Sequence, residues 1–335
     1  MSTTIKIGLI GCGGITDPHI RGYLQIPNQV QVSAVSDVVE ENARHRAEQV
    51  GGAQIYSDYR VMLAESGVDA VDICLPHHLH KDAIVAAANA KKHILCEKPL
   101  CLTLEEAKAV ESAVKENGVT LMCAHNQLFM SAIQKARQLI EEGVLGNVYA
   151  IRTVDSFYHT FDPKTIGWRG NRAMIGGGEL IDTGYHPTYM LLYLANSVPT
   201  EVTAMLSKHR LAFMDGEDSA QVLVRFANGA VGNIVTSWAQ EMTPNTERFS
   251  VRGELGHLYS QGTDLHVHIR GKETQVISFP APEPGPYTFI REIADFARCI
   301  REGGRPINDQ EDGINVLKVI LGAYTSEEEK RTVQL

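Results

Sequence analysis

Lys98 occupies a position from which a lysine can act on a ligand. The tripeptide Glu97-Lys98-Pro99 directly follows the apolar run HILC at 93–96, which predicts a short buried strand. In open α/β sheets ligands bind just beyond the carboxyl ends of the strands, and Pro99 biases Lys98 toward extended geometry. For the tripeptide alone, a solvated lysine in a surface turn is the competing interpretation.

A second group with chemical potential is the run GGGELIDTGYH at 176–186. Its three glycines allow close backbone approach ahead of a helix predicted at 182–194. Asp182 and His186 are four residues apart, so on one helix they share a face. A histidine beside a carboxylate supplies an oriented general base, which suits removal of a hydroxyl proton while hydride leaves. An exposed helical pair without a catalytic role is the alternative.

A glycine-rich turn near the N-terminus predicts a dinucleotide site. The predicted strand 5–10 runs into Gly11-Cys12-Gly13-Gly14-Ile15-Thr16, which opens a helix. Gly11 permits the tight turn, Gly13 lets the backbone approach a pyrophosphate, and the helix N-terminus attracts the phosphates. Thr16 stands where the third glycine of the fingerprint is usual, which tolerates slightly looser packing of helix on strand.

Asp37 ends the next predicted strand and favours NAD over NADP. Its carboxylate can accept hydrogen bonds from ribose hydroxyls and would repel a 2′-phosphate. The nearest arginine that follows is Arg44.

The order of predicted elements indicates two domains of α/β class. Over the first 125 residues, strands at 5–10, 30–36, 70–75, 93–96 and 119–124 alternate with helices at 40–50, 81–90 and 104–117, which predicts a parallel sheet. From about residue 145, strands follow one another and predict a large, mainly antiparallel sheet, at 148–157, 201–209, 219–226, 230–238, 248–252, 257–260, 265–269 and 275–278. Helices are predicted at 287–302 and 310–325. We expect a first domain at 1–125 and a second at 126–305, with the helix at about 306–325 packed back on the first.

Composition narrows the class of protein. The 335 residues carry a formal net charge of −9, which argues against nucleic-acid and acidic-membrane partners. No apolar stretch approaches the ~20 residues that span a bilayer, and the first residues lack a signal-peptide pattern, so a cytoplasmic protein is expected. The six cysteines form no CxxC pair and are interpreted as small core residues.

Together the motifs GCGGI, HILCEKP and GGGxLxDxGxH resemble those of the Gfo/Idh/MocA oxidoreductases, in order and spacing over nearly the whole chain. The resemblance implies an N-terminal Rossmann domain and a C-terminal α/β domain. It also implies an open sheet in the second domain, through which a homodimer or homotetramer forms. The implied activity is NAD(P)-dependent chemistry on sugars or cyclitols.

Carried over by position, the resemblance makes Lys98, Asp182 and His186 catalytic. It places Glu97 beside the nicotinamide, and Trp168 and Arg169 at the border of nicotinamide and substrate. The full set of residues expected at the cofactor is Gly11, Cys12, Gly13, Gly14, Ile15, Asp37, Leu75, Pro76, His80, Glu97, Lys98, Trp168 and Arg169. Residues expected at a polyol substrate are Lys98, Asn126, Tyr158, Arg169, Arg172, Asp182, Tyr185 and His186.

Two positions depart from the family's usual pattern. The family often has Asn-x-Arg after the fifth strand, where this chain has Asn126-Gln127-Leu128, and an acidic residue three after the histidine, where this chain has Tyr189. Both lie near the expected substrate pocket. No metal is expected, because His77, His78 and His80 lack acidic or cysteine partners at ligand spacing.

The sequence therefore predicts an NAD-dependent dehydrogenase that acts on a secondary alcohol of a sugar, sugar derivative or cyclitol. Two alternatives remain open. One is an NAD-dependent glycosidase that works through transient 3-keto oxidation, and the other is a non-catalytic NAD-sensing regulator.

Overall fold

The computed structural model describes residues 4–243, 246–279 and 286–335, and the chain forms two compact units. The first comprises 1–126 and 284–314, and the second comprises 127–283 and 315–335. The sequence assigned residues 126–305 to one domain, and the structure differs there. Helix α10 (Pro286–Glu302) belongs to the first unit because it packs along α1, and residues 315–329 of α11 group with the second unit.

The first unit contains the predicted parallel sheet. Its six strands run in the order β3-β2-β1-β4-β5-β6, with every pair parallel, which is the doubly wound order of dinucleotide-binding domains. The strands are β1 (Ile5–Ile10), β2 (Val30–Ser36), β3 (Gln54–Tyr56), β4 (Ala70–Ile73), β5 (His93–Glu97) and β6 (Leu121–Ala124). The short strand β3 was not predicted.

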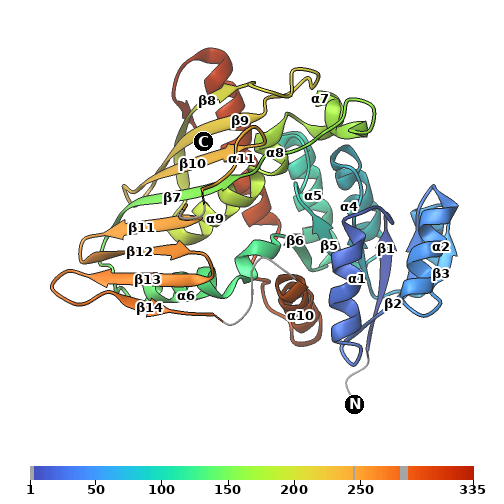
Figure 1. Cartoon of the computed structure of the whole chain (residues 1–335). Coiled ribbons are helices and arrows are strands. Elements are labelled where there is room, and N and C mark those ends of the chain that lie inside the picture. The colour runs from blue at the N-terminus through green and yellow to red at the C-terminus, as the bar shows by residue number, and fades with distance from the viewer. Residues whose placement is uncertain (1–3, 244–245, 280–285) are drawn as a thin grey trace. The chain divides into compact units, whose positions relative to one another are not determined.

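Helices flank this sheet: α1 (Thr16–Gln25), α2 (Glu40–Gln49), α3 (Tyr59–Glu65), η1 (His77–Leu79), α4 (His80–Asn89), α5 (Leu104–Asn117) and α10. Helix α10 lies alongside α1 (Figure 1), and Gly22 permits the close approach. A Cβ at Gly22 would lie 2.7 Å from Cδ1 of Ile293. Thr103 caps α5, because its hydroxyl accepts the N–H of Glu106 at 3.1 Å.

The second unit is built on the predicted mainly antiparallel sheet. Its nine strands run in the order β14-β13-β12-β11-β7-β10-β9-β8-β15, and only β7 and β10 pair in parallel (Figure 1). They are β7 (Val148–Ser156), β8 (Pro199–Ser207), β9 (Ser219–Phe226), β10 (Val231–Ser237), β11 (Phe249–Gly253), β12 (Gly256–Gln261), β13 (Asp264–Ile269), β14 (Gln275–Ile277) and β15 (Val333–Gln334). β9 and β10 form a hairpin, and Gly229 in its turn takes φ 86°.

The remaining helices include those that carry the second motif. They are η2 (Asn126–Phe129), α6 (Ser131–Glu141), η3 (Gly167–Gly170), α7 (Arg172–Ile175), α8 (Glu179–Asp182), α9 (Tyr185–Ala195) and α11 (Gln310–Glu329). Helix α9 packs on β7 and β10, so one face of the sheet is covered there.

The helix predicted at 182–194 is interrupted, so Asp182 and His186 do not share one continuous helix. Asp182 ends α8, and α9 begins at Tyr185. The hydrogen-bond ladder breaks at this point. Gly184 N–H donates to the carbonyl of Glu179, five residues back, and His186 N–H donates to that of Thr183, three residues back.

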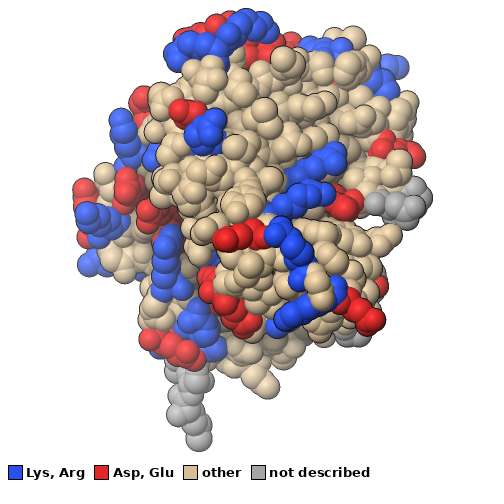
Figure 2. Space-filling view, turned by 90° about the vertical axis from the view of Figure 1, so that its left-hand side faces the viewer, with Lys and Arg blue, Asp and Glu red and all other residues tan. Residues whose placement is uncertain are grey.

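All six cysteines are buried, as predicted for small core residues, and none forms a disulfide. No helix among the described residues is long and apolar enough to cross a membrane. On the face drawn in Figure 2, basic and acidic side chains are interspersed among uncharged ones.

Candidate active site

The glycine turn of the first unit exposes backbone at the start of α1. Gly11 has φ 91°, and a Cβ there would collide with the carbonyl oxygen of Cys74. A Cβ at Gly13 or Gly14 would meet nothing within 4 Å, so the backbone is open to a ligand at these two residues. The Thr16 hydroxyl donates to the carbonyl of Gly11 at 3.0 Å. The threonine that replaces the third glycine therefore closes the turn.

Asp37 and Arg46 hold this turn from the side of β2 and α2. Oδ2 of Asp37 accepts the N–H of Cys12 at 2.7 Å. Nη2 of Arg46, which is buried, donates to the carbonyl of Gly13 at 2.9 Å. The contact of Arg46 with this turn was not predicted from the sequence. Arg44, the arginine that the sequence analysis named, forms an exposed ion pair with Glu40 on the same helix.

The turn fits a dinucleotide on three counts. Its glycine backbone is open, it leads into a helix N-terminus, and a carboxylate stands at the end of β2. Burial, reinforced by the charge of Asp37, raises the pKa of the Cys12 thiol to about 12, so this cysteine is no thiolate nucleophile.

Lys98 follows β5 in a segment that is fixed by neighbouring groups. Its peptide bond to Pro99 is cis, and its N–H donates to Oε2 of Glu97 at 3.1 Å. The buried ring of His80 lies with Nδ1 2.6 Å from the carbonyl oxygen of Pro99 and Nε2 2.8 Å from that of Leu75. His80 therefore ties the start of α4 to the lysine segment.

A buried hydrogen-bond network adjoins the Lys98 segment, and it was not predicted from the sequence. Both ring nitrogens of His19, on α1, meet carboxylates: Nδ1 is 2.8 Å from Asp72 and Nε2 is 2.9 Å from Glu97. The Tyr23 hydroxyl donates to the same Asp72 at 2.9 Å. Burial alone would lower the pKa of His19, but the two carboxylates raise it well above its usual value. His19 is thus a buried cation between two anions.

His125, directly after β6, also lies near Lys98. Burial, with the positive charge of Lys98 added, lowers the pKa of His125 to about 3. This ring stays neutral at any working pH.

In the second unit, Asp182 is paired with Arg169. Oδ2 of the buried Asp182 accepts from Nε of Arg169 at 2.9 Å. The guanidinium lies over the ring of Trp168, 4.5 Å from its centroid. Three of the predicted residues are therefore brought together, Asp182 at the end of α8 and Trp168 and Arg169 in η3.

His186, at the start of α9, is oriented by a residue that the sequence assigned to no role. Its Nδ1 is 2.7 Å from the hydroxyl oxygen of Tyr189. That hydroxyl also accepts the backbone N–H of Gln127 at 3.2 Å. The spacing of three residues on a helix was the available signal.

The other predicted substrate residues have separate surroundings. Tyr158 is exposed, and its hydroxyl accepts from Arg210 at 3.0 Å. Arg172 is exposed and pairs with Glu328 at 3.3 Å. Tyr185 is fully buried, and Asn126 is buried at the start of η2 in the first unit.

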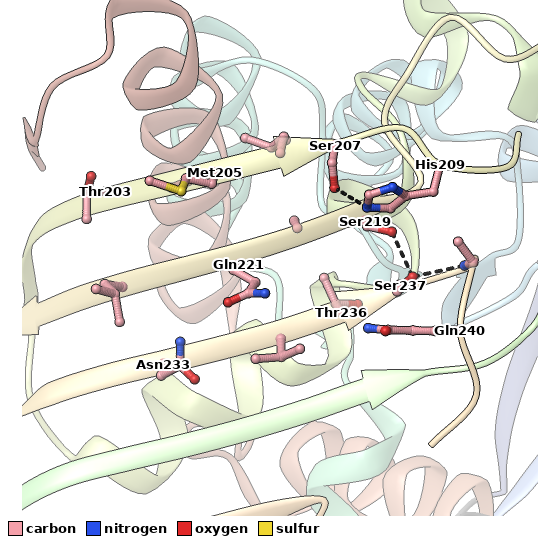
Figure 3. A pocket seen from close by; sticks show the side chains of 16 residues that line it. Thr203, Met205, Ser207, His209, Ser219, Gln221, Asn233, Thr236, Ser237 and Gln240 are labelled. Carbon is pink, nitrogen blue, oxygen red and sulfur yellow. Dashed lines mark hydrogen bonds between the residues drawn. The ribbon is translucent and has the colours of Figure 1, made fainter. Parts of the chain in front are cut away.

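A hollow of about 570 Å³ lies elsewhere in the second unit, on the face of the sheet formed by β8, β9 and β10 (Figure 3). Polar side chains such as Ser207, Gln221 and Asn233 line it together with the apolar Met205. None of the predicted site residues is among those that line it.

Among the described residues, the side chains of one group, His19, Asp72 and Cys74, lie close enough together to hold a metal ion. Each already has a protein partner within this group or beside it: the His19 ring bonds Asp72 and Glu97, and the Cys74 thiol donates to Asp72 at 3.6 Å. Burial also raises the pKa of Cys74 well above its usual value, which disfavours the thiolate that binds metals.

The chain matches two family models. Residues 5–125 match the oxidoreductase family with NAD-binding Rossmann fold, and residues 133–259 match the Gfo/Idh/MocA C-terminal domain. Levoglucosan dehydrogenase of Pseudarthrobacter phenanthrenivorans is 28% identical, over 93% of this chain and 93% of its own. Myo-inositol 2-dehydrogenase of Thermotoga maritima is 27% identical, over 99% and 98%.

Among solved structures, levoglucosan dehydrogenase in complex with NADH and levoglucosan is 28% identical, with a TM-score of 0.90 over 99% of both chains. The parallel sheet, the open glycine turn and the second-unit motif agree with these matches. The chain belongs to the Gfo/Idh/MocA family of NAD-binding oxidoreductases.

Proposed function

We propose that the chain is a dehydrogenase that oxidises a secondary alcohol of a sugar, sugar derivative or cyclitol, with NAD as hydride acceptor. The observation that carries this proposal is the polar group of the second unit. A buried carboxylate, Asp182, is fixed by Arg169 shortly before a histidine whose ring is oriented through Nδ1. Its relatives named for levoglucosan and myo-inositol both act on polyhydroxylated rings, which supports this substrate class.

Each site residue has a proposed role. His186 removes the hydroxyl proton, and Lys98 donates a hydrogen bond to the same oxygen and stabilises the developing alkoxide. Asp182 accepts from a neighbouring substrate hydroxyl, with Arg169 holding it in place. In the first unit, the N–H groups after Gly13 and the carboxylate of Asp37 bind the pyrophosphate and ribose. Bound NAD supplies a nicotinamide that accepts the hydride.

The test is an NADH-release screen at 340 nm over sugars, sugar acids, glycosides and inositols, with levoglucosan and myo-inositol included. We expect stoichiometric NADH with at least one polyol, and loss of turnover in Lys98→Ala and His186→Ala with NAD binding retained. Glycoside cleavage without accumulating NADH would instead indicate the redox-neutral glycosidase. NAD binding with no turnover over the whole panel would indicate a sensor.

We also propose that the chain forms a homodimer or homotetramer through the open face of the second unit's sheet. On this face Met205 is 80% exposed and Leu223 is 46% exposed, and both line the hollow of Figure 3. Apolar side chains so exposed on a sheet are typical of an interface. Leu223→Glu should lower the mass measured by light scattering, whereas Val61→Glu, at a side chain 44% exposed on α3, should not. An unchanged mass for Leu223→Glu would contradict this interface.

The cellular compartment and the partners that we propose for the protein are argued from its thiols and its net charge. Six buried thiols without a disulfide suit the reducing cytoplasm. A net charge of −9 gives no basis for a nucleic-acid partner.

A further inference from the structure

The hydroxyl group of Tyr189 is held by two hydrogen bonds that meet at one oxygen. It accepts the backbone N–H of Gln127 at 3.2 Å, and it lies 2.7 Å from Nδ1 of His186. Tyr189 stands where the family often has an acidic residue, and Gln127 is the middle residue of Asn126-Gln127-Leu128, which departs from the family's Asn-x-Arg at Leu128. Gln127 and Tyr189, 62 residues apart in sequence, thus meet at the hydroxyl that contacts the ring assigned as the base.

The surroundings keep this hydroxyl in place. The Tyr189 side chain is only 2% exposed and its ring packs edge-on against Tyr185, with centroids 6.3 Å apart. Oε1 of Gln127 accepts from Nη1 of Arg248 at 2.9 Å, and the same nitrogen lies 3.4 Å from Asp155. The phenol and the peptide that donates to it are therefore both anchored within the second unit.

Counting donors and acceptors restricts what the hydroxyl can do. A phenolic oxygen has two lone pairs and one proton, and a backbone N–H can only donate. The backbone N–H of Gln127 therefore occupies one lone pair, which leaves one lone pair and the phenolic proton for other contacts. The other lone pair can accept a proton carried by Nδ1 of His186, at a distance typical of a good hydrogen bond.

We propose that Tyr189 is a positioning residue that accepts the Nδ1–H of His186, and so holds the neutral ring in the tautomer whose Nε2 bears the lone pair. This rests on the proposed function, in which His186 is the base. When Nε2 takes the hydroxyl proton, the Nδ1–H stays on the same acceptor, so protonation requires no rearrangement of the ring. Because Tyr189 is neutral, it stabilises the imidazolium less than a carboxylate would, and the proton passes on more readily.

The variant Tyr189→Phe removes the hydroxyl and keeps the ring. Its matched control is Tyr193→Phe on the same helix, where the lost hydroxyl lies 3.2 Å from Nε2 of Gln134 instead. With the panel substrate that gives the highest rate, kcat of Tyr189→Phe should fall roughly ten- to hundredfold, as expected for loss of a hydrogen bond to a charged group. KM for NAD should not change.

The pH profile separates positioning from general damage. Loss of the acceptor disfavours the imidazolium, so the acid limb of kcat/KM should move to lower pH in Tyr189→Phe and stay in place in Tyr193→Phe. Wild-type kcat together with an unshifted profile in Tyr189→Phe would overturn the proposal.

The tautomer can be measured without turnover. In protein labelled with ¹⁵N-histidine, the His186 signals are assigned by their absence from His186→Gln. The proposal requires that the neutral wild-type ring carries its proton on Nδ1, and a proton on Nε2 would refute it. If no panel substrate reacts, the proposed function fails, while this measurement still decides the role of Tyr189.

Discussion

Replacing His19 with glutamine should destabilise the first unit strongly, because it removes the cation from a fully buried network. His19 lies between Asp72 and Glu97, at 2.8 and 2.9 Å. Removing one partner of a buried ion pair typically costs 3–5 kcal/mol. Tyr23 still donates to Asp72 and the Lys98 N–H to Glu97, so neither carboxylate is left bare. We therefore expect the lower part of this range, about 3–4 kcal/mol in the free energy of unfolding.

The pH dependence provides a second check with a definite sign. The pKa of His19 is raised on folding, so its stabilisation is complete below the pKa of the unfolded chain, about 6.5, and is lost as pH rises through the folded pKa. Two neighbours that also interact with this ring, Glu292 and Tyr23, have pKa values raised by burial, which favours their neutral forms. The difference between wild type and His19→Gln should thus shrink as pH rises from 6 to 9.

Hydrogen exchange of the peptides that contain β4 and β5 reports the opening of this unit alone. His45→Gln, at an exposed histidine of α2, serves as the control and should match wild type. A His19→Gln variant within 1 kcal/mol of wild type at pH 6 (a threshold of roughly one ordinary hydrogen bond) would refute the network argument, and so would a difference that grows with pH.

Three further changes test other parts of the structure. We expect the wild type to prefer NAD over NADP by roughly ten- to a hundredfold, and Asp37→Ala should reduce this preference. The measurement is kcat/KM with each cofactor, and a wild type that prefers NADP would contradict the prediction. Arg46→Met should weaken NAD binding about tenfold in a fluorescence titration, because the carbonyl of Gly13 loses its charged donor, and unchanged affinity would count against a role in shaping the turn. Gly177→Ala should destabilise the second unit by about 1–3 kcal/mol, measured as urea unfolding, because its methyl group would overlap the Tyr324 hydroxyl; a neutral result would show that the helix yields.

The sequence predicted elements whose boundaries coincide with strong local signals. Strands 5–10 and 30–36 match residue for residue, because mostly buried runs rich in isoleucine and valine end at Gly11 and Asp37. The strand β3, at 54–56, is short and largely exposed, so it leaves no hydrophobic pattern to detect. The break between α8 and α9 was not predicted either. Thr183 and Gly184 both keep helical dihedral angles. Only the hydrogen-bond ladder reveals it.

Contacts between residues that are far apart in sequence could not be predicted, and this limited the prediction of the site. The motif glycines and Asp37 were found because their spacing within one βαβ unit is itself the signal. His19 could not be found in this way, since its partners lie 53 and 78 residues away. Arg46 lies among the charged residues of α2, where nothing in the pattern separates the one buried arginine from its exposed neighbours.

Three histidines of this chain show why residue type alone does not identify a base. His19 is held as a cation by two buried carboxylates, and His125 is held neutral by burial beside Lys98. A ring fixed in either state cannot cycle a proton near neutral pH. His186 differs because it is only partly buried and its Nδ1 meets a neutral hydroxyl. In the proposed function His186 is therefore the ring that accepts and releases the proton, and Tyr189 is the partner that we propose for its Nδ1.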